Sequence, residues 1–177
     1  EVVYDELLDS TIELSKQVPV LINYSYAGKK YEKKPDDNDM HIIQEISSMR
    51  LPYSVPLMKL IDGYNTDQPR KSHGINYLHQ FYTNRNLYAI SVIYNKLKEY
   101  DTPKHQILTF TFEQILMGMA KIARYVPSHF SQVNQYLSGT LYIGSQVVEV
   151  TPRYILENKI SNLAKGYGLT HYSGEDC

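Results

Sequence analysis

The spacing of hydrophobic side chains changes along the chain between helical and strand periods, which predicts a mixed α+β fold. The clearest helical pattern runs from residue 84 to about residue 99, where apolar side chains recur every three or four positions. This apolar face comprises Leu87, Ile90, Ile93, Tyr94 and Leu97. Thr83 precedes the pattern and is predicted to cap the helix by accepting a hydrogen bond from the amide of Arg85 or Asn86. We therefore expect residues 74–97 to lie at the centre of the fold.

Four other segments have helical patterns, and one long segment has none. We predict an opening helix over residues 2–17 and a short helix that Asp39 caps and that reaches about residue 49. A Thr-Pro pair begins each of the last two predicted helices, one from residue 102 to about residue 124 and one from residue 151 to Gly166. Prolines interrupt residues 51–72, which we predict to be a long loop.

Two pairs of short β-branched and aromatic runs predict antiparallel hairpins. The first pair is residues 18–26 and 30–35, and the second is residues 138–143 and 147–150. We thus expect several amphipathic helices and two small β-hairpins in a single domain, residues 1–165. Residues 166–177 are expected to be a flexible tail. Both ends of the chain suggest a segment cut from a longer protein, since it does not begin with methionine.

Charge and composition exclude several classes of function. The net charge of −1 provides no overall attraction to nucleic acid, so DNA contact would need a local patch. The 17 tyrosines favour an aromatic core with a wet rim, and a surface that stacks on bases or sugars is the alternative. The single cysteine, Cys177, excludes an internal disulfide and a cysteine-based zinc site. No apolar run reaches the length of a membrane span, and we expect no membrane partner.

The lysines of the first predicted hairpin admit two interpretations. They are Lys29, Lys30, Lys33 and Lys34, and acidic residues at 36, 37 and 39 follow them directly. A solvated hairpin next to a helix start is the favoured interpretation, and a phosphate-binding strip is the alternative.

The chain lacks the usual catalytic motifs: a glycine-rich phosphate loop, a His-Glu-x-x-His pair and a nucleophile elbow are all missing. His73 and His79 could converge on a metal, but no carboxylate cluster accompanies them, and we expect no metal site. We therefore expect no catalytic residue in this segment.

Three polar corners are the positive signal. Arg85 lies in the first turn of its predicted helix, where the helix dipole disfavours a cation, so it should meet an anion or acceptor outside the helix. The 51–72 loop ends in a positive tip formed by Arg70, Lys71 and His73. Arg124 stands near Ser128 at the other corner, where a structural role at a helix end is an equally good interpretation.

Four segments resemble the middle part of bacterial DNA methyltransferases of the amino-methylating kind. They occur in the same order between about residues 16 and 163. The first segment is residues 17–24 with 30–36, and the second is Gly74-Ile75 with His79 and the Phe-Tyr-Thr-Asn-Arg-Asn-Leu run at 81–87. The third is Arg124-Tyr125 with residues 127–128. The fourth is the Ser-Gly-Thr-Leu-Tyr-Ile run at 138–143, followed by a Glu-Asn-Lys-Ile helix at 157–160. Relatives are richer in histidine around His79, where this chain has Tyr77 and Gln80.

The resemblance implies a bacterial, cytoplasmic enzyme that methylates adenine N6 or cytosine N4 in double-stranded DNA with S-adenosylmethionine, as in restriction-modification. The family's cofactor motif and its Asp-Pro-Pro-aromatic loop are absent, so this segment would bind no cofactor and would serve target recognition beside the catalytic domain of the same protein. Phosphate contacts are expected from Arg70, Lys71, Arg85 and Arg124. His73, His79 and Ser128 belong to the same expected surface, with Tyr82, Asn84 and Asn86 near base edges.

Two other interpretations remain. The chain could be a structural or oligomerisation insert that buttresses the catalytic domain without touching DNA, which its near-neutral charge favours. An independent small-molecule enzyme ranks last, because no group of residues supports it.

Overall fold

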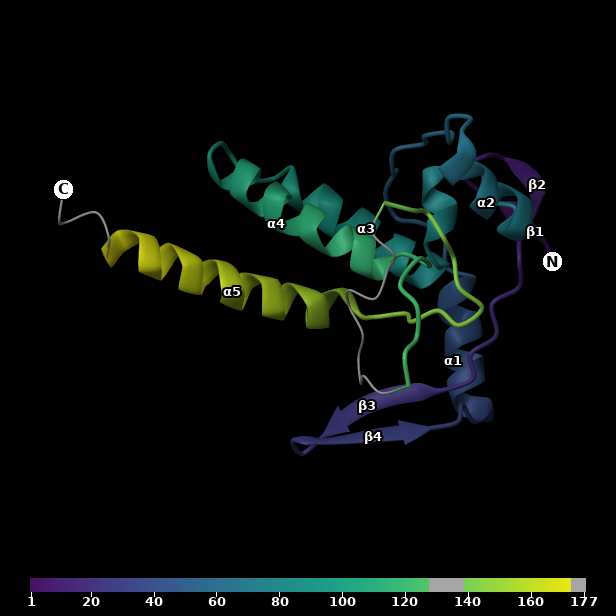
Figure 1. Cartoon of the computed structure of the whole chain (residues 1–177), viewed down its shortest axis with the longest axis horizontal. Coiled ribbons are helices and arrows are strands. Elements are labelled where there is room, and N and C mark those ends of the chain that lie inside the picture. Colours follow the sequence, from purple (N-terminus) through teal and green to yellow (C-terminus); the bar gives the residue numbers. More distant parts are fainter. Residues whose placement is uncertain (128–138, 173–177) are drawn as a thin grey trace.

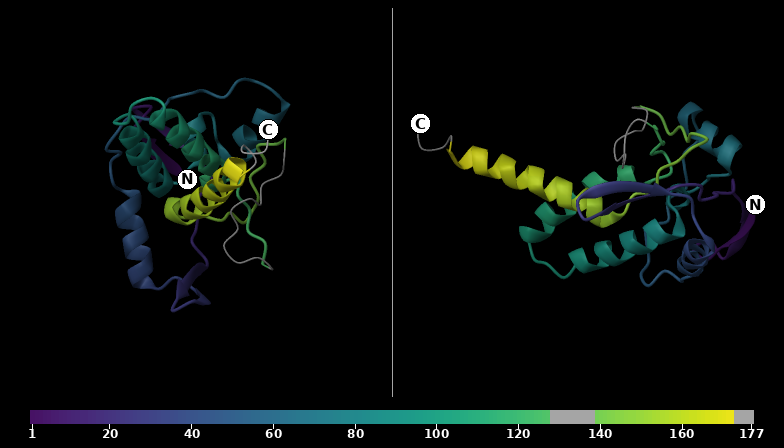
Figure 2. Two further views of the ribbon diagram at one scale, coloured as in Figure 1. Left: turned by 90° about the vertical axis from the view of Figure 1, so that its left-hand side faces the viewer. Right: turned by 90° about the horizontal axis from the view of Figure 1, so that it is seen from below.

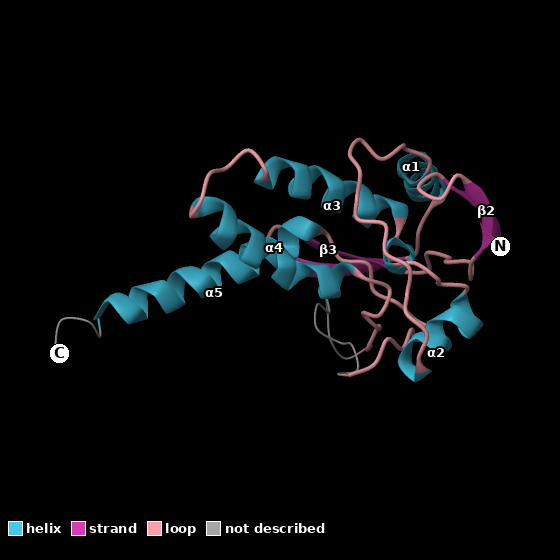
Figure 3. Ribbon diagram, turned by 90° about the horizontal axis from the view of Figure 1, so that it is seen from above, coloured by secondary structure: helices cyan, strands magenta, loops and turns pink. Residues whose placement is uncertain are grey.

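Helices α3 (Asn84–Leu97) and α4 (Lys104–Met119) form a helical hairpin, and α5 (Pro152–Tyr172) packs along α4 (Figure 1, Figure 3). The structure is a computed structural model and describes residues 1–127 and 139–172. The described part is mixed α+β, with five α-helices and two small antiparallel β-hairpins, as predicted. None of its helices is long and apolar enough to cross a membrane.

Two hydrophobic clusters form the core. The first joins the three long helices through Ile90, Leu97, Phe112, Ile115, Met119, Val150 and Ile155. The second lies where the chain enters α3 and leaves α4, and contains Ile75, Phe81, Ala120, Ile122 and Ile143. Tyr82 packs against both clusters, so the segment before α3 is the junction between them. The prediction that residues 74–97 are central is confirmed.

The predicted opening helix is wrong. Residues 2–17 contain the strands β1 (Val2–Asp5) and β2 (Ser10–Glu13), paired antiparallel with Asp5 opposite Ser10. The turn between them has a positive φ of 49° at Asp9, which a helix does not permit. Over so short a window the apolar residues fit both periods, and the β-branched pairs Val2-Val3 and Thr11-Ile12 favour the strand.

The first predicted hairpin, over residues 18–26 and 30–35, is confirmed as β3 (Ile22–Tyr26) and β4 (Lys29–Lys33). Its turn, Ala27-Gly28, has positive φ at both residues, 48° and 75°, the geometry that suits the twist of a two-residue hairpin. In Figure 1 and the left view of Figure 2 the hairpin lies at the lower edge of the molecule, below the helical layer and beside α1 (Asp37–Ser47). We call β3 and β4 with their turn the β3–β4 arm.

Helix α1 is confirmed, but Asp36 caps it instead of Asp39. The Asp36 side chain accepts from the Asp39 amide and the Asp39 side chain accepts from the Asp36 amide, both at 2.9 Å, which forms a reciprocal capping box.

The predicted loop over residues 51–72 is wrong in its second half, which forms α2 (Tyr64–His73). Asp67 supports this helix through ion pairs to Arg70 and Lys71, three and four residues later. Gly74 ends it in the left-handed conformation with a φ of 73°. These ion pairs support the helix locally, and its buried residue Pro69 packs it against the rest of the fold.

Thr83 caps α3 as predicted, since its hydroxyl accepts from the Asn86 amide at 3.3 Å. The short 3₁₀ helix η1 (Leu78–Phe81) precedes it. Helix α4 differs from its prediction at both ends: Pro103 occupies the capping position instead of Thr102, and the helix ends at Met119 instead of about 124.

The second predicted hairpin, over residues 138–150, is wrong in its described part. Val147 pairs as an antiparallel bridge with Arg124, and the Val148 amide donates to the Ala123 carbonyl at 2.7 Å. The β-branched run at 147–150 thus finds its partner in the segment after α4. Gly166 does not end α5, which continues to Tyr172 and extends beyond the other helices (Figure 1).

Candidate functional site

The N-terminus of α3 contains a bidentate ion pair. The Arg85 guanidinium contacts Glu149 through Nε to Oε1 and Nη2 to Oε2, each at 2.9 Å. The Thr83 hydroxyl donates to the same Oε1 at 2.5 Å. The prediction that Arg85 meets an anion is confirmed, and the anion is a carboxylate of the chain itself.

The two asparagines at this end of α3 connect it to neighbouring helices. Asn84 Nδ2 donates to the carbonyls of Ser47 and Met49 at 2.6 and 2.9 Å, at the C-terminal end of α1. Asn86, which is 2% exposed, donates to the Met119 carbonyl at the end of α4 at 2.8 Å. These amides, expected near base edges, are occupied by the backbone of the chain.

Tyr82 is partly buried and packs against both core clusters. Burial raises the pKa of its phenol to about 12, because the phenolate would lose its hydration. Its position favours a packing role over contact with a base.

The positive tip on α2 is balanced by acidic neighbours. Arg70 contacts Asp67 at 2.8 Å and Asp62 at 3.2 Å, and Lys71 contacts Asp67 at 2.9 Å. The hydrogen bond from Lys71 and the charges of Lys71 and Arg70 lower the pKa of the Asp67 carboxyl. The Lys71 side chain is still 77% exposed, and such exposed pairs are weak, so it remains accessible to other anions.

His73 is the last residue of α2. Its Nδ1 lies 2.6 Å from the Ser72 hydroxyl, and burial together with the charge of Lys121 lowers the pKa of its imidazole. The neutral ring is therefore favoured, which makes it a poor phosphate contact.

Arg124 is exposed and belongs to a segment that the structure connects to the Arg85 ion pair. Residues 146–148 pair with 123–125, and Glu149 follows directly. The corners at Arg85 and Arg124 are thus joined through the extended segment 146–149. Among the described residues no ion pair involves Arg124, and Ser128 lies outside the described residues.

His79 is buried against the carboxylate of Asp5 in the β1–β2 hairpin. Its Nε2 lies 2.8 Å from Asp5 Oδ2, and Gln80 Nε2 donates to the same oxygen at 3.1 Å. Burial by itself raises the pKa of the Asp5 carboxyl, but the hydrogen bonds from His79 and Gln80 outweigh burial and lower it. We call these three residues the Asp5 cluster. Within the described ranges no group of three or more His, Cys, Asp or Glu side chains could hold a metal ion.

A half-buried lysine, Lys121, lies near both the Asp5 cluster and Glu149 of the Arg85 ion pair. Its ammonium donates to the Gln80 carbonyl at 2.9 Å. Burial lowers its pKa to about 8, although the negative charges of Glu149 and Glu1 act in the opposite direction.

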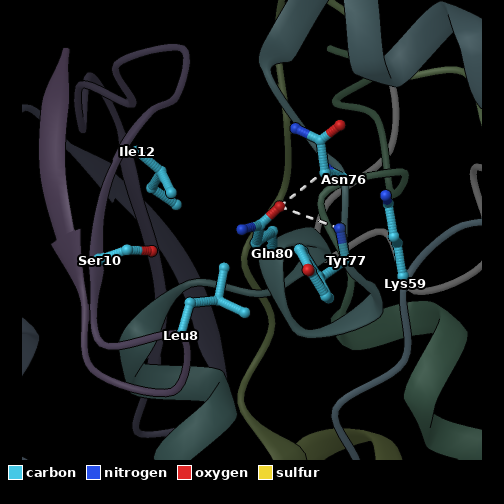
Figure 4. A pocket seen from close by; sticks show the side chains of 7 residues that line it. All are labelled: Leu8, Ser10, Ile12, Lys59, Asn76, Tyr77 and Gln80. Carbon is cyan, nitrogen blue, oxygen red and sulfur yellow. Dashed lines mark hydrogen bonds between the residues drawn. The ribbon is translucent and has the colours of Figure 1, made fainter.

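An open cavity of about 330 Å³ adjoins the Asp5 cluster (Figure 4). One side of its lining comes from the β1–β2 hairpin and consists of Leu8, Ser10 and Ile12. The other side comes from the segments around η1 and consists of Lys59, Asn76, Tyr77 and Gln80. Polar and apolar side chains both line it.

The β3–β4 arm presents an aromatic face. The register places Tyr24 opposite Tyr31, and Tyr26 opposite Lys29, on the same side of the ribbon. The rings of Tyr24 and Tyr31 stack at 5.3 Å with an interplanar angle of 20°. Tyr26 is 72% exposed, and in the described part of the chain no ion pair involves Lys29.

Three important residues escaped the sequence analysis. Glu149 carried a visible signal, because a glutamate between Val148 and Val150 interrupts an apolar run and calls for a partner. Asp5 and Lys121 carried none, since each acquires its environment only from residues far away in the sequence.

No protein-family model, no curated protein and no solved structure matches this chain.

Proposed function

We propose that this chain is the non-catalytic, DNA-holding segment of an S-adenosylmethionine-dependent DNA methyltransferase, with adenine N6 as the target. The order of the four resembling segments supports the class of enzyme. The observation that carries the DNA-holding role is the β3–β4 arm, whose tyrosines and Lys29 share one exposed face.

The shape and chemistry of the arm suit a DNA groove. A two-stranded β-ribbon fits the major groove, which is about 12 Å wide. Lys29 at the tip supplies a charge for a phosphate, and the exposed ring of Tyr26 supplies a flat surface for a sugar or base. The Asp36 and Asp39 carboxylates engage Lys33 at 3.2 and 2.6 Å, so the base of the arm is neutralised and its tip is not.

The polar corners take a different role in this proposal. Arg85, Asn84 and Asn86 hold the α3 N-terminus to the rest of the fold, so we assign them to positioning and not to DNA. Lys71 and Arg124, which are exposed, remain supplementary phosphate contacts. Methyl transfer and cofactor binding belong to the rest of the parent enzyme.

Titration of labelled duplex DNA with the chain at several salt concentrations tests this function. The three phosphate contacts from Lys29, Lys71 and Arg124 predict that the affinity falls about fortyfold between about 50 and about 200 mM salt. The control is an excess of unlabelled heparin, which should compete. Absence of salt-sensitive binding at micromolar protein would contradict the proposal.

A second candidate function, a buttress for the catalytic domain, is favoured by an apolar surface on α4 and α5. Ile107, Phe110 and Ile160 are 48%, 54% and 55% exposed. Ile107, Phe110 and Leu163 also line a second cavity of about 200 Å³, together with Gln106 and Thr111. A contiguous exposed apolar surface is typical of an interface.

Phe110→Ser separates the two candidates. If the chain is a buttress, this variant weakens association with the separately produced catalytic domain and leaves DNA binding unchanged. If it only holds DNA, Phe110→Ser changes neither property.

A further inference from the structure

Lys121 lies at the junction where the chain leaves α4 and passes η1. Its backbone amide donates to the Phe81 carbonyl at 2.7 Å, and its neighbours Ala120 and Ile122 are buried in the second core cluster. The side chain itself is half-buried, and its Nζ donates to the Gln80 carbonyl at 2.9 Å. Both ends of this residue are therefore attached to the segment that precedes α3.

The Lys121 ammonium is poorly neutralised for a half-buried cation. An ammonium has three N–H donors, and within the described ranges only the Gln80 carbonyl accepts from this one. The Glu149 carboxylate is engaged by Arg85 and Thr83, and among the described residues no ion pair involves Lys121. The contacts of this side chain thus satisfy a neutral amine better than a charged one.

Three titratable groups interact with this amine. The carboxylates of Glu149 and Glu1 favour its charged form. The third group is His73 at the end of α2, whose pKa burial and the charge of Lys121 lower. Burial outweighs the two carboxylates and lowers the pKa of Lys121 to about 8. About a quarter of the amine is then neutral at about pH 7.5, and a neutral amine is a nucleophile.

The surroundings favour an uncharged product of this nucleophile. Acylation turns the amine into an amide, which has no charge and keeps one N–H for the Gln80 carbonyl. Addition of carbon dioxide would instead create a carbamate anion in the field of the Glu149 and Glu1 carboxylates, which disfavours it. Because the side chain is half-buried, a small acyl donor fits better than a large one.

We propose that Lys121 is a modification site that takes an acyl group from a small acyl phosphate. The lone pair of Nζ forms a bond to the acyl carbon, the bond from that carbon to the phosphate oxygen breaks, and inorganic phosphate leaves with the electron pair. The amine proton passes to solvent. The acylated side chain is uncharged at every pH, a state that unmodified Lys121 reaches only as the pH rises through about 8. This site goes beyond the proposed function and does not depend on it.

Incubation of the chain with acetyl phosphate at about pH 7.5, followed by peptide mass spectrometry, measures the acylation rate of each lysine. Lys33 and Lys96 are the matched controls, because hydrogen bonds to neighbouring carboxylates raise their pKa values. Lys121 should react at least about tenfold faster than either control. Its rate should level off above about pH 9, whereas the rates of the controls should keep rising beyond about pH 10.

Unfolding in urea is the second control, since it gives every lysine the same solvent and should abolish the advantage of Lys121. Glu149→Gln removes a charge that favours the protonated amine, so it should speed acylation of Lys121 several-fold at about pH 7 and leave Lys96 unchanged. If this variant does not fold, the pH profile of the wild type still decides. A Lys121 rate no higher than those of Lys33 and Lys96, acylation of Lys121 only in urea, or an unchanged rate in folded Glu149→Gln would overturn the site.

Discussion

Arg85 and Glu149 are 64 positions apart in the sequence and form a two-point ion pair at the start of α3. A cation at a helix N-terminus is electrostatically unfavourable by itself, and the carboxylate removes that penalty. Glu149 also accepts from Thr83, the cap of the same helix. The pair therefore fastens α3 to the extended segment 146–149, which in turn pairs with the segment that carries Arg124.

This pair predicts coupled effects on stability. Arg85→Ala and Glu149→Ala should each lower the free energy of unfolding by about 1 kcal/mol, and the double variant should cost less than their sum by about 0.5–1 kcal/mol. The estimate is modest because the two side chains are 43% and 30% exposed. Urea unfolding measures all four proteins. The exposed pair Arg153–Glu157 is the matched control and should couple by only a few tenths of a kcal/mol. Strict additivity at Arg85 and Glu149 would contradict the fastening role.

Gly74→Ala should be severely destabilising. Gly74 has a φ of 73°, and a Cβ there would collide with the carbonyl oxygen of Glu13. We expect a loss above about 3 kcal/mol in the free energy of unfolding, since both backbone strain and a clash with β2 contribute.

Gly28→Ala is the control, with a φ of 75° and open space around the added Cβ. It should cost only the strain of the left-handed conformation, roughly 1–2 kcal/mol. Equal losses from Gly74→Ala and Gly28→Ala would show that the contact with Glu13 is absent.

Asp5→Ala should destabilise the chain by about 2–4 kcal/mol. The substitution leaves His79 Nε2 and Gln80 Nε2 buried without an acceptor, and the Leu7 amide loses its bond at 3.1 Å. Glu6→Ala, on the same hairpin but exposed, should cost under about 0.5 kcal/mol. Thermal unfolding followed by circular dichroism compares them. A loss from Asp5→Ala no larger than that from Glu6→Ala would contradict a structural role for the Asp5 cluster.

Lys121 predicts an increase of stability with pH above neutrality. Its pKa is about 8 in the folded chain and 10.5 in the unfolded one, so the unfolded chain binds more protons between these values. The free energy of unfolding should rise by about 1–2 kcal/mol from about pH 7.5 to about pH 9.5. Above about pH 10 the raised pKa of Tyr82 acts in the opposite direction, because only the unfolded chain then ionises this phenol.

Denaturant unfolding at several pH values measures this dependence. In Lys121→Met the rise should disappear. A rise of the same size in that variant would assign the effect to other groups.

Local patterns were sufficient to predict α3, its Thr83 cap and the β3–β4 hairpin, because their signals lie within a few residues. The count of two hairpins was also right, but one of them was placed wrongly. Val147 and Val148 have strand-forming side chains, yet their partners are Arg124 and Ala123, which no local rule selects. At residues 2–13 the local pattern itself was ambiguous, because so short a window fits both the helical and the strand period.

The candidate site was predictable only in part. Helix-dipole reasoning predicted that Arg85 meets an anion, but it could not choose between a phosphate and Glu149. His79 was selected as a surface residue, and it is buried because Asp5 folds against it from 74 positions away. The cavity has no sequence signature, because one wall comes from the β1–β2 hairpin and the other from segments around η1 that are far away in the sequence.

The central claim is that the β3–β4 arm, and not the N-terminus of α3, holds DNA. Fluorescence anisotropy with a labelled duplex at about 50 mM salt compares the wild type with three variants. These are the arm variant, which combines Tyr26→Ala and Lys29→Ala, the variant Arg85→Ala, and the control Ser25→Ala on the opposite face of the arm. The account predicts a loss of affinity of about tenfold or more for the arm variant. It predicts changes within about twofold for Arg85→Ala and Ser25→Ala, whose side chains contact no phosphate in this account. An arm variant that binds as tightly as the wild type, together with an Arg85→Ala variant that does not, would contradict it.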